Sequence, residues 1–525
     1  MNVQIALLKR ILAENRQTEF GLKYDFRSIK DFPGFCERVP INEYEALRPY
    51  IASEIAGGKS TLTKCPPIRY VRTSGTTDKH KDIPLIRKHL FGLRTVHRAA
   101  VGFQYRSCPE AFAGGILAIV SPTFEGFLAN GKQYGSASGI VAGNTPALVR
   151  EKFVLPKEVL TVSNSRLKYL LILRLALQRS DITYISTANA TTLLTMMKLY
   201  QEHASELADD LREGTFFLMD QLPDEVKLPV TKRLVASPNR ALELIKIASK
   251  SATVRMSDLW PHLKLIVTWT CGSAGIAVDR LRHELTPSMR VFELGYVSSE
   301  FRGTITLGKN FGTGFPTIDN HFFEFVERSK WEQGSTETLT VCDVKKGRDY
   351  YLIVTTPSGL YRYFINDLVR VTGFFFKTPL LKFLQKGKGV TNITGEKLYE
   401  SQVLSAVRIA MTRLSRPAFF VMMLADEENR RYRLYVETDS GPKPDGEWLA
   451  REVDASLKES NIEYFAKRES ERLGSPIACW LAPETGEAYK QFCTERGQRE
   501  GQFKIVALCY QKDFGFDLDA RVEKD

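Results

Sequence analysis

The spacing of apolar residues changes along the chain, and each change predicts a different kind of element. Near the N-terminus, Ile5, Leu8, Ile11 and Leu12 fall on one face of a helix, in a segment that reads as helical to about residue 70. From there to about residue 300, short apolar runs at 116–120, 183–186, 263–269 and 290–294 alternate with helical patterns. Strands interleaved with helices predict a largely parallel sheet with helices on both faces.

Residues 320–386 differ, because their apolar runs are closely spaced and separated by turn residues. The runs cover 321–328, 338–346, 350–359, 360–376 and 380–386. This pattern predicts an antiparallel barrel or distorted sheet. After residue 389 the pattern predicts a helix at 400–414, a hairpin of 418–424 with 431–438, and a helix at 447–458.

The fold class that these patterns predict is α/β with at least two domains, since 525 residues exceed what one compact core holds. We place the boundary near Lys386. Residues 1–386 form the predicted N-terminal domain, with the antiparallel β subdomain at about 320–386. Residues 387–525 form a small α+β C-terminal domain.

Composition narrows the class of protein. Hydrophobic residues make up 43% and charged residues 26%, which is ordinary for a soluble globular protein. The eight cysteines form no CxxC pair, which argues against a zinc site or a disulfide framework and favours the cytoplasm. We expect no signal peptide and no membrane span, because the apolar stretches are too short. The net charge of +12 comes without a nucleic-acid-binding motif and would suit an acidic carrier protein.

The first candidate site is the segment Thr73-Ser74-Gly75-Thr76-Thr77, followed by Lys81. It suits a phosphate-binding loop, because glycine lets backbone N–H groups approach the anion, hydroxyls donate hydrogen bonds and lysine neutralises charge. The segment lacks the Gly-x-x-x-x-Gly-Lys-Ser/Thr spacing of P-loop proteins, so it indicates a different ATP-binding architecture. Taken alone, it also fits an ordinary polar turn.

The second candidate site is Tyr296-Val297-Ser298-Ser299-Glu300, directly after a predicted strand. The tyrosine could place its ring against adenine, and the glutamate could hold a Mg²⁺ that bridges phosphates. The alternatives are a core aromatic and a solvated carboxylate. Upstream, the small residues of the segment 271–275, Cys-Gly-Ser-Ala-Gly, would let a flat base lie near the backbone.

The third candidate site is the segment 359–367, Gly-Leu-Tyr-Arg-Tyr-Phe-Ile-Asn-Asp. A fixed carboxylate at Asp367 could accept hydrogen bonds from both ribose hydroxyls. Asn-Asp is also common turn chemistry, so this segment is ambiguous by itself.

Together and in this order, the three segments resemble the plant auxin-responsive Gretchen Hagen family of acyl acid–amido synthetases and its bacterial relatives. The family pattern is a Ser/Thr-Ser-Gly-Thr-Thr/Ser loop, then Tyr-x-Ser-Ser-Glu, then Tyr-Arg-Tyr-x-x-Gly-Asp. The family belongs to the adenylate-forming superfamily. The resemblance covers nearly the whole chain, and further segments similar to family landmarks are 18–21, 39–41, 44–45, 321–325, 395–397 and 501–504.

The resemblance implies a ligase that uses ATP and Mg²⁺ to convert a carboxylic acid to acyl-AMP and pyrophosphate, and then transfers the acyl group to an amine. It implies a mobile C-terminal lid that carries Lys504 to the α-phosphate, where a preplaced ammonium stabilises developing negative charge. It implies Glu300 as the Mg²⁺ ligand and Lys81 as a second catalytic cation. The implied nucleotide-binding residues are Ser74, Gly75, Thr76, Thr77, Gly272, Ser273, Tyr296, Ser298, Ser299, Phe322, Asp367 and Lys386.

Three positions depart from the family pattern. The loop after Thr77 is one residue short and lacks its second glycine. Asn366 replaces the glycine before Asp367, a mild change because asparagine tolerates the left-handed backbone. Lys386 stands where the family has arginine, at the hinge, and loses the planar fork of the guanidinium.

Two other functions use the same nucleotide-binding residues. One is thioester formation with coenzyme A or a carrier protein, and the other is non-catalytic nucleotide binding. We assign no catalytic role to any of the seven histidines. The acid is expected to bind between the helix after 83–85 and the segment 183–197, where an apolar or aromatic acyl group is plausible. Neither the acid nor the amine, which could be an amino acid, can be identified.

Overall fold

The computed structural model describes residues 2–57, 61–73, 80–142, 149, 151–250, 253–308, 312–387, 389–498 and 503–523. The chain divides into two compact units. Unit 1 comprises Met1–Thr270, Glu284–Ile365 and Val369–Lys382, and unit 2 comprises Cys271–His283, Asn366–Leu368 and Phe383–Asp525. The boundary that the sequence places near Lys386 stays a prediction. Unit 2 differs from that C-terminal domain by two short upstream segments and by starting its main segment at Phe383.

Unit 1 begins with four helices, α1 (Asn2–Asn15), α2 (Glu19–Lys23), α3 (Phe32–Arg38) and α4 (Tyr44–Ile55). Helix α1 buries Leu8, Ile11 and Leu12, as its amphipathic pattern predicts. The Thr18 side chain caps α2 by accepting a hydrogen bond from the Gly21 backbone N–H.

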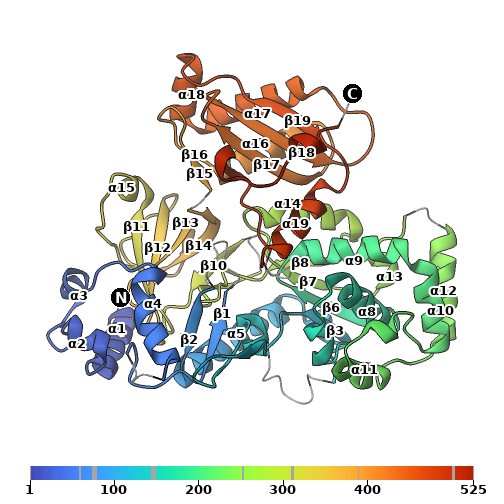
Figure 1. The fold of residues 1–525 in the computed structure, drawn as a ribbon, viewed down its shortest axis with the longest axis horizontal. Helices are drawn as coiled ribbons and strands as arrows, with labels where there is room; N and C mark the ends of the chain where they lie inside the picture. The colour runs from blue at the N-terminus through green and yellow to red at the C-terminus, as the bar shows by residue number, and fades with distance from the viewer. Residues whose placement is uncertain are drawn as a thin grey trace. The chain divides into compact units, whose positions relative to one another are not determined.

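A four-stranded sheet of order β3-β6-β7-β8 is parallel throughout (Figure 1). Its strands are β3 (Gly115–Ile119), β6 (Ile182–Thr187), β7 (Leu265–Thr268) and β8 (Arg290–Glu293). They confirm the four predicted runs and the largely parallel sheet. Helices accompany these strands along the chain, namely α5 (Arg87–Ser107), α8 (Ser165–Leu177), α9 (Ala190–Glu202), α10 (Ala204–Glu213), α11 (Asp224–Thr231), α12 (Pro238–Lys250) and α13 (Met256–Leu259).

A six-stranded sheet of order β11-β12-β13-β14-β10-β9 forms the second layer of unit 1. Its strands are β9 (Thr304–Thr306), β10 (Thr313–Pro316), β11 (Phe322–Glu327), β12 (Asp349–Thr355), β13 (Tyr363–Phe375) and β14 (Thr378–Lys386). The pairs β11–β12, β10–β14 and β9–β10 are antiparallel, in agreement with the distorted antiparallel sheet expected there.

One strand predicted for this sheet is wrong. Residues 338–346 form turns, with a single bridge of Leu339 to Phe325. The Asp343 carboxylate accepts hydrogen bonds from the Thr340 backbone N–H and from its hydroxyl, so the polar side chains satisfy the backbone locally.

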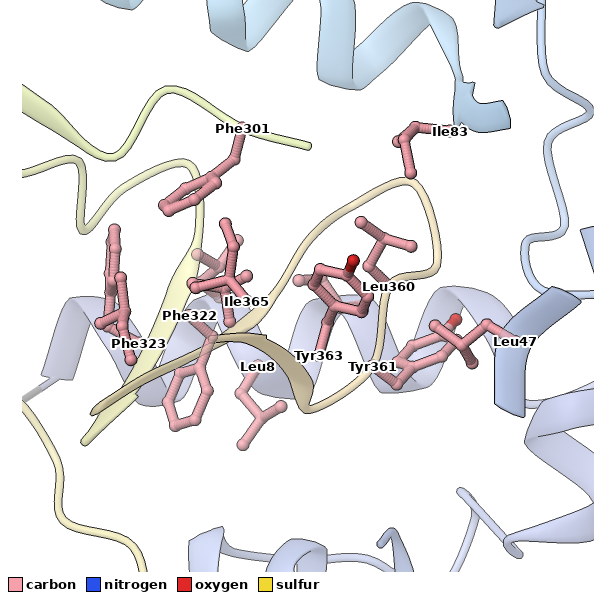
Figure 2. Packing of buried hydrophobic residues seen from close by; sticks show 14 of the residues in the cluster. Leu8, Leu47, Ile83, Phe301, Phe322, Phe323, Leu360, Tyr361, Tyr363 and Ile365 are labelled. Atoms are coloured by element: carbon pink, nitrogen blue, oxygen red, sulfur yellow. The ribbon is translucent and has the colours of Figure 1, made fainter. Parts of the chain in front are cut away.

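The aromatic residues of the third candidate segment pack into the main core of unit 1. Figure 2 shows Tyr361 and Tyr363 among the residues of this cluster, with Leu8 of α1 and Phe322 of β11. The Tyr361 ring stacks on that of Phe20 at a centroid distance of 4.8 Å. The N-terminal helices therefore fix the position of this segment.

Unit 2 contains a sheet of order β19-β18-β17-β20 with helices packed beside it (Figure 1). The strands are β17 (Ala418–Asp426), β18 (Arg431–Thr438), β19 (Ile477–Leu481) and β20 (Leu508–Tyr510). The helices include α14 (Ala274–Leu281), α16 (Glu400–Arg413), α17 (Gly446–Ser460), α18 (Ile462–Glu469) and α19 (Thr485–Glu495). The predicted hairpin and both predicted helices of this region are confirmed. Within the residues that the structure describes, we find no helix with the length and apolar character of a membrane span.

Candidate functional site

The predicted phosphate-binding loop lies between β1 (Arg69–Arg72) and β2 (Asp82–Leu85), which pair antiparallel. Its residues Ser74, Gly75, Thr76 and Thr77 lie outside the described residues. The ends of the loop meet, because the Thr73 backbone N–H donates to the Lys81 carbonyl at 3.0 Å. Lys81 is therefore held at the neck of this hairpin.

Lys81 and Glu300 are joined by a tyrosine to which the sequence assigned no role. The Lys81 ammonium donates to the Tyr363 hydroxyl oxygen at 3.2 Å, and that hydroxyl donates to Glu300 Oε1 at 3.3 Å. Tyr363 is buried, on β13. The second and third candidate segments and Lys81 thus meet through side chains. In the sequence, Tyr363 is indicated only by its place in the Tyr-Arg-Tyr motif.

Glu300 is presented by a tight loop that runs from Tyr296 to Thr304. The Tyr296 backbone N–H donates to the Thr304 hydroxyl at 2.9 Å, and Gly303 N–H donates to the Tyr296 carbonyl at 2.7 Å. Inside the loop, the Glu300 N–H donates to Ser298 Oγ at 3.3 Å. Tyr296, Ser298, Ser299 and Glu300 are half-buried, so their side chains keep some solvent-accessible surface.

Phe322 lies in the hydrophobic core. Its side chain has 0% exposed surface, and its ring packs against those of Phe32 at 5.7 Å and Phe35 at 6.3 Å. A ring that is buried in this way has no free face for adenine in this arrangement. The predicted contact with adenine stays untested, and we leave Phe322 out of the site proposed below.

In unit 2, Asp367 is paired with Lys386. The Lys386 ammonium donates to Asp367 Oδ1 at 3.3 Å, and the side chain of Asp367 is almost fully buried. Asn366 has a φ of 56°, which confirms the left-handed backbone expected at the residue that replaces a glycine. The predicted hinge lysine thus contacts the carboxylate predicted to hold the ribose.

Unit 2 also brings the segment 271–275 next to the Lys504 region. The Ser273 hydroxyl donates to the Ile505 carbonyl at 2.7 Å, and the Lys504 ammonium lies 5.8 Å from the centroid of the Phe383 ring. Gly272 has a φ of 61°, and a Cβ there would lie 3.3 Å from the Phe383 ring. Gly272, Ser273 and Lys504 are therefore close together, as a shared role requires.

A cavity of about 450 Å³ lies in the same unit, between α14, α16 and β17. Apart from Gly272, its lining contains none of the predicted site residues. Ile276, Leu404, Val407 and Met411 give it a largely apolar wall. The cavity is therefore adjacent to the predicted nucleotide-binding segment and is not itself that site.

Glu400, at the start of α16, is a buried carboxylate that sequence reasoning missed. It accepts a hydrogen bond from the Ala507 N–H at 2.8 Å. Burial raises the pKa of Glu400 to about 7, and neither this hydrogen bond nor the charge of Lys386 offsets it. Glu400 contacts the segment that follows Lys504, but a buried glutamate at a helix start has no sequence signature.

Two histidines and an arginine of unit 1 have shifted pKa values. Burial lowers the pKa of His89 to about 3 and that of His97 to about 4, so both imidazoles are neutral at pH 7. Arg302, two residues after Glu300, is buried, and burial lowers its pKa to about 10. Arg302 therefore stays charged at neutral pH although its side chain is buried.

Three family models match most of the chain. They are described as the GH3 family N-terminal domain at residues 1–291, the GH3 family central domain at 315–386 and the GH3 family C-terminal domain at 401–513. Among curated proteins, indole-3-acetic acid-amido synthetase GH3.3 of Arabidopsis thaliana is 23% identical, over 99% of this chain and 91% of the relative. Indole-3-acetic acid-amido synthetase GH3.15 of the same plant is 26% identical, over 88% of this chain and 79% of the relative.

Several solved structures share the fold. The GH3.15 acyl acid amido synthetase superposes with a TM-score of 0.86 at 22% identity, over 100% of this chain and 94% of that one. A 2-hydroxyisobutyryl-CoA ligase in the postadenylation state superposes with a TM-score of 0.56 at 12% identity, over 97% and 89%. The predicted α/β class and two-domain adenylate-forming architecture are confirmed by these matches.

Proposed function

Because the chain belongs to the GH3 family, we propose that it is an ATP-dependent ligase that adenylates a carboxylic acid and transfers the acyl group to an amine. Named relatives along nearly the full length are acid-amido synthetases, and the fold is shared with an acyl acid amido synthetase. The observation that carries the proposal is the chain of contacts from Lys81 through Tyr363 to Glu300. It places a cation and a carboxylate on one hydroxyl, beside the hairpin that is expected to hold phosphates.

In unit 1, we assign Lys81 with Ser74, Gly75, Thr76 and Thr77 to the phosphates of ATP. Glu300 fits a Mg²⁺ ligand, because a carboxylate with remaining acceptor capacity suits a cation that keeps phosphate and water oxygens as its other ligands. When bound, Mg²⁺ would neutralise charge on the phosphates. Tyr296 is assigned to the adenine ring, with Ser298 and Ser299 in the same loop.

In unit 2, we assign Asp367 to the ribose and Gly272 and Ser273 to the base. Lys386 orients the Asp367 carboxylate through their ion pair. Lys504 supplies positive charge at the α-phosphate, where charge grows as the substrate carboxylate attacks. The bond between the α- and β-phosphates breaks, and pyrophosphate leaves with its electron pair. The amine then attacks the acyl carbon, and AMP leaves with the electron pair of the broken bond. The excess proton of the amine passes to solvent.

The test is acid-dependent exchange of pyrophosphate into ATP, measured over a panel of carboxylic acids. We expect exchange with at least one acid, a loss of about 100-fold or more in Glu300→Gln and Lys504→Ala, and no change in Arg212→Met. Arg212 is a suitable control, since it lies on α10 in a mainly exposed ion pair with Asp209. Equal exchange in wild type and both site variants would contradict the assignment.

A second candidate is thioester formation with a thiol, which the shared fold with a CoA ligase favours. Amide synthesis and thioester synthesis use the same first half-reaction, so exchange does not separate them. Supplying an amino acid panel or coenzyme A with the accepted acid does. We expect amide with an amino acid and no acyl-CoA; the reverse result would select the thiol as acceptor.

A further inference from the structure

Arg302 is held rigidly at a junction of several elements in unit 1. It lies at the far side of the Tyr296–Thr304 loop, where Val297 and Arg302 form a bridge. Its carbonyl accepts a hydrogen bond from the Thr317 hydroxyl at 2.8 Å. Only 7% of its surface is exposed. The backbone is thus fixed, and the side chain points away from bulk solvent.

The guanidinium of Arg302 uses few of its donors. Nη1 donates to His97 Nδ1 at 3.3 Å and Nη2 donates to the Leu294 carbonyl at 3.2 Å. Among the residues that the structure describes, Nε has no hydrogen-bond partner. No described carboxylate acts on the charge of Arg302. A guanidinium carries five N–H donors and prefers a planar, bidentate anionic acceptor, so Arg302 has unused capacity for such a group.

Arg174 shows what a buried structural arginine looks like in the same unit. Its side chain donates to the carbonyls of Thr215, Asp210 and Val235 and to Gln178 Oε1. A buried polar group normally finds such partners, because an unsatisfied donor costs free energy. Within the described part of the chain, the Arg302 guanidinium donates only to His97 and the Leu294 carbonyl, so part of its hydrogen-bonding capacity is unused.

The surroundings of Arg302 coincide with the place where the sequence predicts the acid. His97 lies on α5, the helix after 83–85, and its imidazole is neutral and accepts from Arg302. Tyr184, on β6, interacts electrostatically with Arg302 and donates its hydroxyl to Gln104 Oε1 at 2.9 Å. Arg302 therefore contacts α5 and lies within electrostatic range of β6, the two elements predicted to border the acyl pocket.

We propose that Arg302 selects the acid substrate by binding a second anionic group, so that the substrate class is dicarboxylic acids or acids with an equivalent anionic oxygen group. The inference rests on the proposed function. Arg302 binds the second anionic group and not the carboxylate that reacts, because a carboxylate held on both oxygens by a guanidinium is a poor nucleophile. Arg302 is thus a specificity-determining residue, and the acyl pocket is less apolar than the sequence suggests.

The experiment compares matched acids that differ by one carboxylate, glutarate against pentanoate and phthalate against benzoate. Binding of each acid is measured by calorimetry, and pyrophosphate exchange gives kcat/KM, for wild type, Arg302→Met, Arg302→Lys and the control Arg212→Met. We expect wild type to prefer the diacid of at least one pair. Arg302→Met should lower its affinity and kcat/KM by about 10- to 100-fold, the size of a charge-assisted contact, and leave the monoacid unchanged. Arg302→Lys should be intermediate, since it keeps the charge and loses the fork.

Two results would overturn the inference. One is a wild-type protein that binds no diacid more tightly than its matched monoacid. The other is an equal loss for both acids in Arg302→Met, which would assign Arg302 to the reacting carboxylate or to the fold. Failure of the proposed function looks different. Diacid binding that depends on Arg302, without exchange for any acid, would keep the selectivity and reject the adenylation.

Discussion

Arg362 and Arg302 are both buried in unit 1, yet their surroundings are opposite. The Arg362 guanidinium pairs with Glu324 at 2.9 Å and also donates to the carbonyls of Cys36 and Val39. It joins α3 to the six-stranded sheet. Arg302 has two long contacts and an unpartnered Nε. The charge of Arg362 holds secondary-structure elements together, whereas the guanidinium of Arg302 can still bind an anion.

Unit 2 repeats this contrast with two glutamates four positions apart. Glu396 accepts hydrogen bonds from Ile393, from Thr394 and from the Tyr432 hydroxyl. Burial alone would raise the pKa of Glu396, but these donors outweigh it and lower the pKa. Glu400 has one backbone donor, and its pKa is raised. In these two pairs, the polar group with many partners is the one that holds elements together, and the group with few partners lies beside residues assigned to chemistry.

We expect the largest change in stability when the ion pair of Arg362 and Glu324 is broken. Arg362→Met leaves the Glu324 carboxylate, whose side chain is 0% exposed, without its cation. We expect a loss of about 3–5 kcal/mol in the free energy of unfolding, measured by urea titration, because an uncompensated buried charge remains. Arg212→Met should change stability by no more than about 0.5 kcal/mol. A loss below about 1 kcal/mol in Arg362→Met would remove the distinction between the two regions.

The next largest change in stability is expected for Glu400→Gln, and its size depends on pH. Its folded pKa of about 7 lies above the ordinary value of 4.5 for a glutamate, so the folded chain binds the proton more tightly. Stability from this group is complete below pH 4.5 and is lost as pH rises to about 7. Glu400→Gln should remove a fall of about 3 kcal/mol over this range.

Glu396→Gln is the matched comparison for that measurement. The pKa of Glu396 is lowered, so its contribution is present above the unfolded pKa and is lost as pH falls. Unfolding free energies from pH 4.5 to 8 should therefore show Glu396→Gln less stable than wild type at the high end. If both variants change stability in the same direction at pH 8, the assignment of saturated and unsaturated glutamates is wrong.

Tyr363 and Tyr361 sharpen the comparison at the level of single hydroxyls. Tyr363→Phe removes the link between Lys81 and Glu300, and we expect a fall of about 10-fold in pyrophosphate exchange together with a higher Mg²⁺ requirement. Tyr361→Phe removes a hydroxyl that donates to the Leu62 carbonyl at 2.7 Å, so it should lower stability and leave the Mg²⁺ dependence unchanged. The measurement is the pyrophosphate exchange rate of each variant as a function of Mg²⁺ concentration. Identical Mg²⁺ curves for the two variants would reject a positioning role for Tyr363.

The smallest effect is expected for the stability of Arg302→Met without ligand. A cation that no carboxylate compensates gives the folded state little, so the free energy of unfolding should stay within about 1 kcal/mol of wild type or rise. Urea titration in the absence of acids measures it. A loss as large as that of Arg362→Met would make Arg302 a structural residue.

The sequence predicted those parts of the fold that depend on local patterns. The four apolar runs of the parallel sheet and the hairpin of β17 and β18 are where periodicity placed them. The strand predicted at 338–346 was wrong because the local hydrogen bonds of Asp343 compete with strand pairing. The spacing of apolar residues does not show that a polar side chain forms these local hydrogen bonds.

The sequence predicted only those residues of the candidate site that belong to a contiguous motif. The site assignments stay predictions, though Lys81 and Glu300 do meet through Tyr363. Lys81 and Tyr363 are 282 positions apart, and Glu400 and Ala507 are 107 apart. Such contacts are made by tertiary packing, so neither spacing nor composition signals Tyr363, Glu400 or the unsaturated Arg302.

Asn366 has a consequence for how this chain could have diverged. Its Oδ1 occupies the space beside Gly387, where an added Cβ would lie 1.7 Å from it. A side chain at 387 therefore requires Asn366 to rotate away or to be replaced by a smaller residue such as glycine. Because the two positions share this space, we expect substitutions at 366 and 387 to be epistatic. Among homologues, residues 366 and 387 should covary.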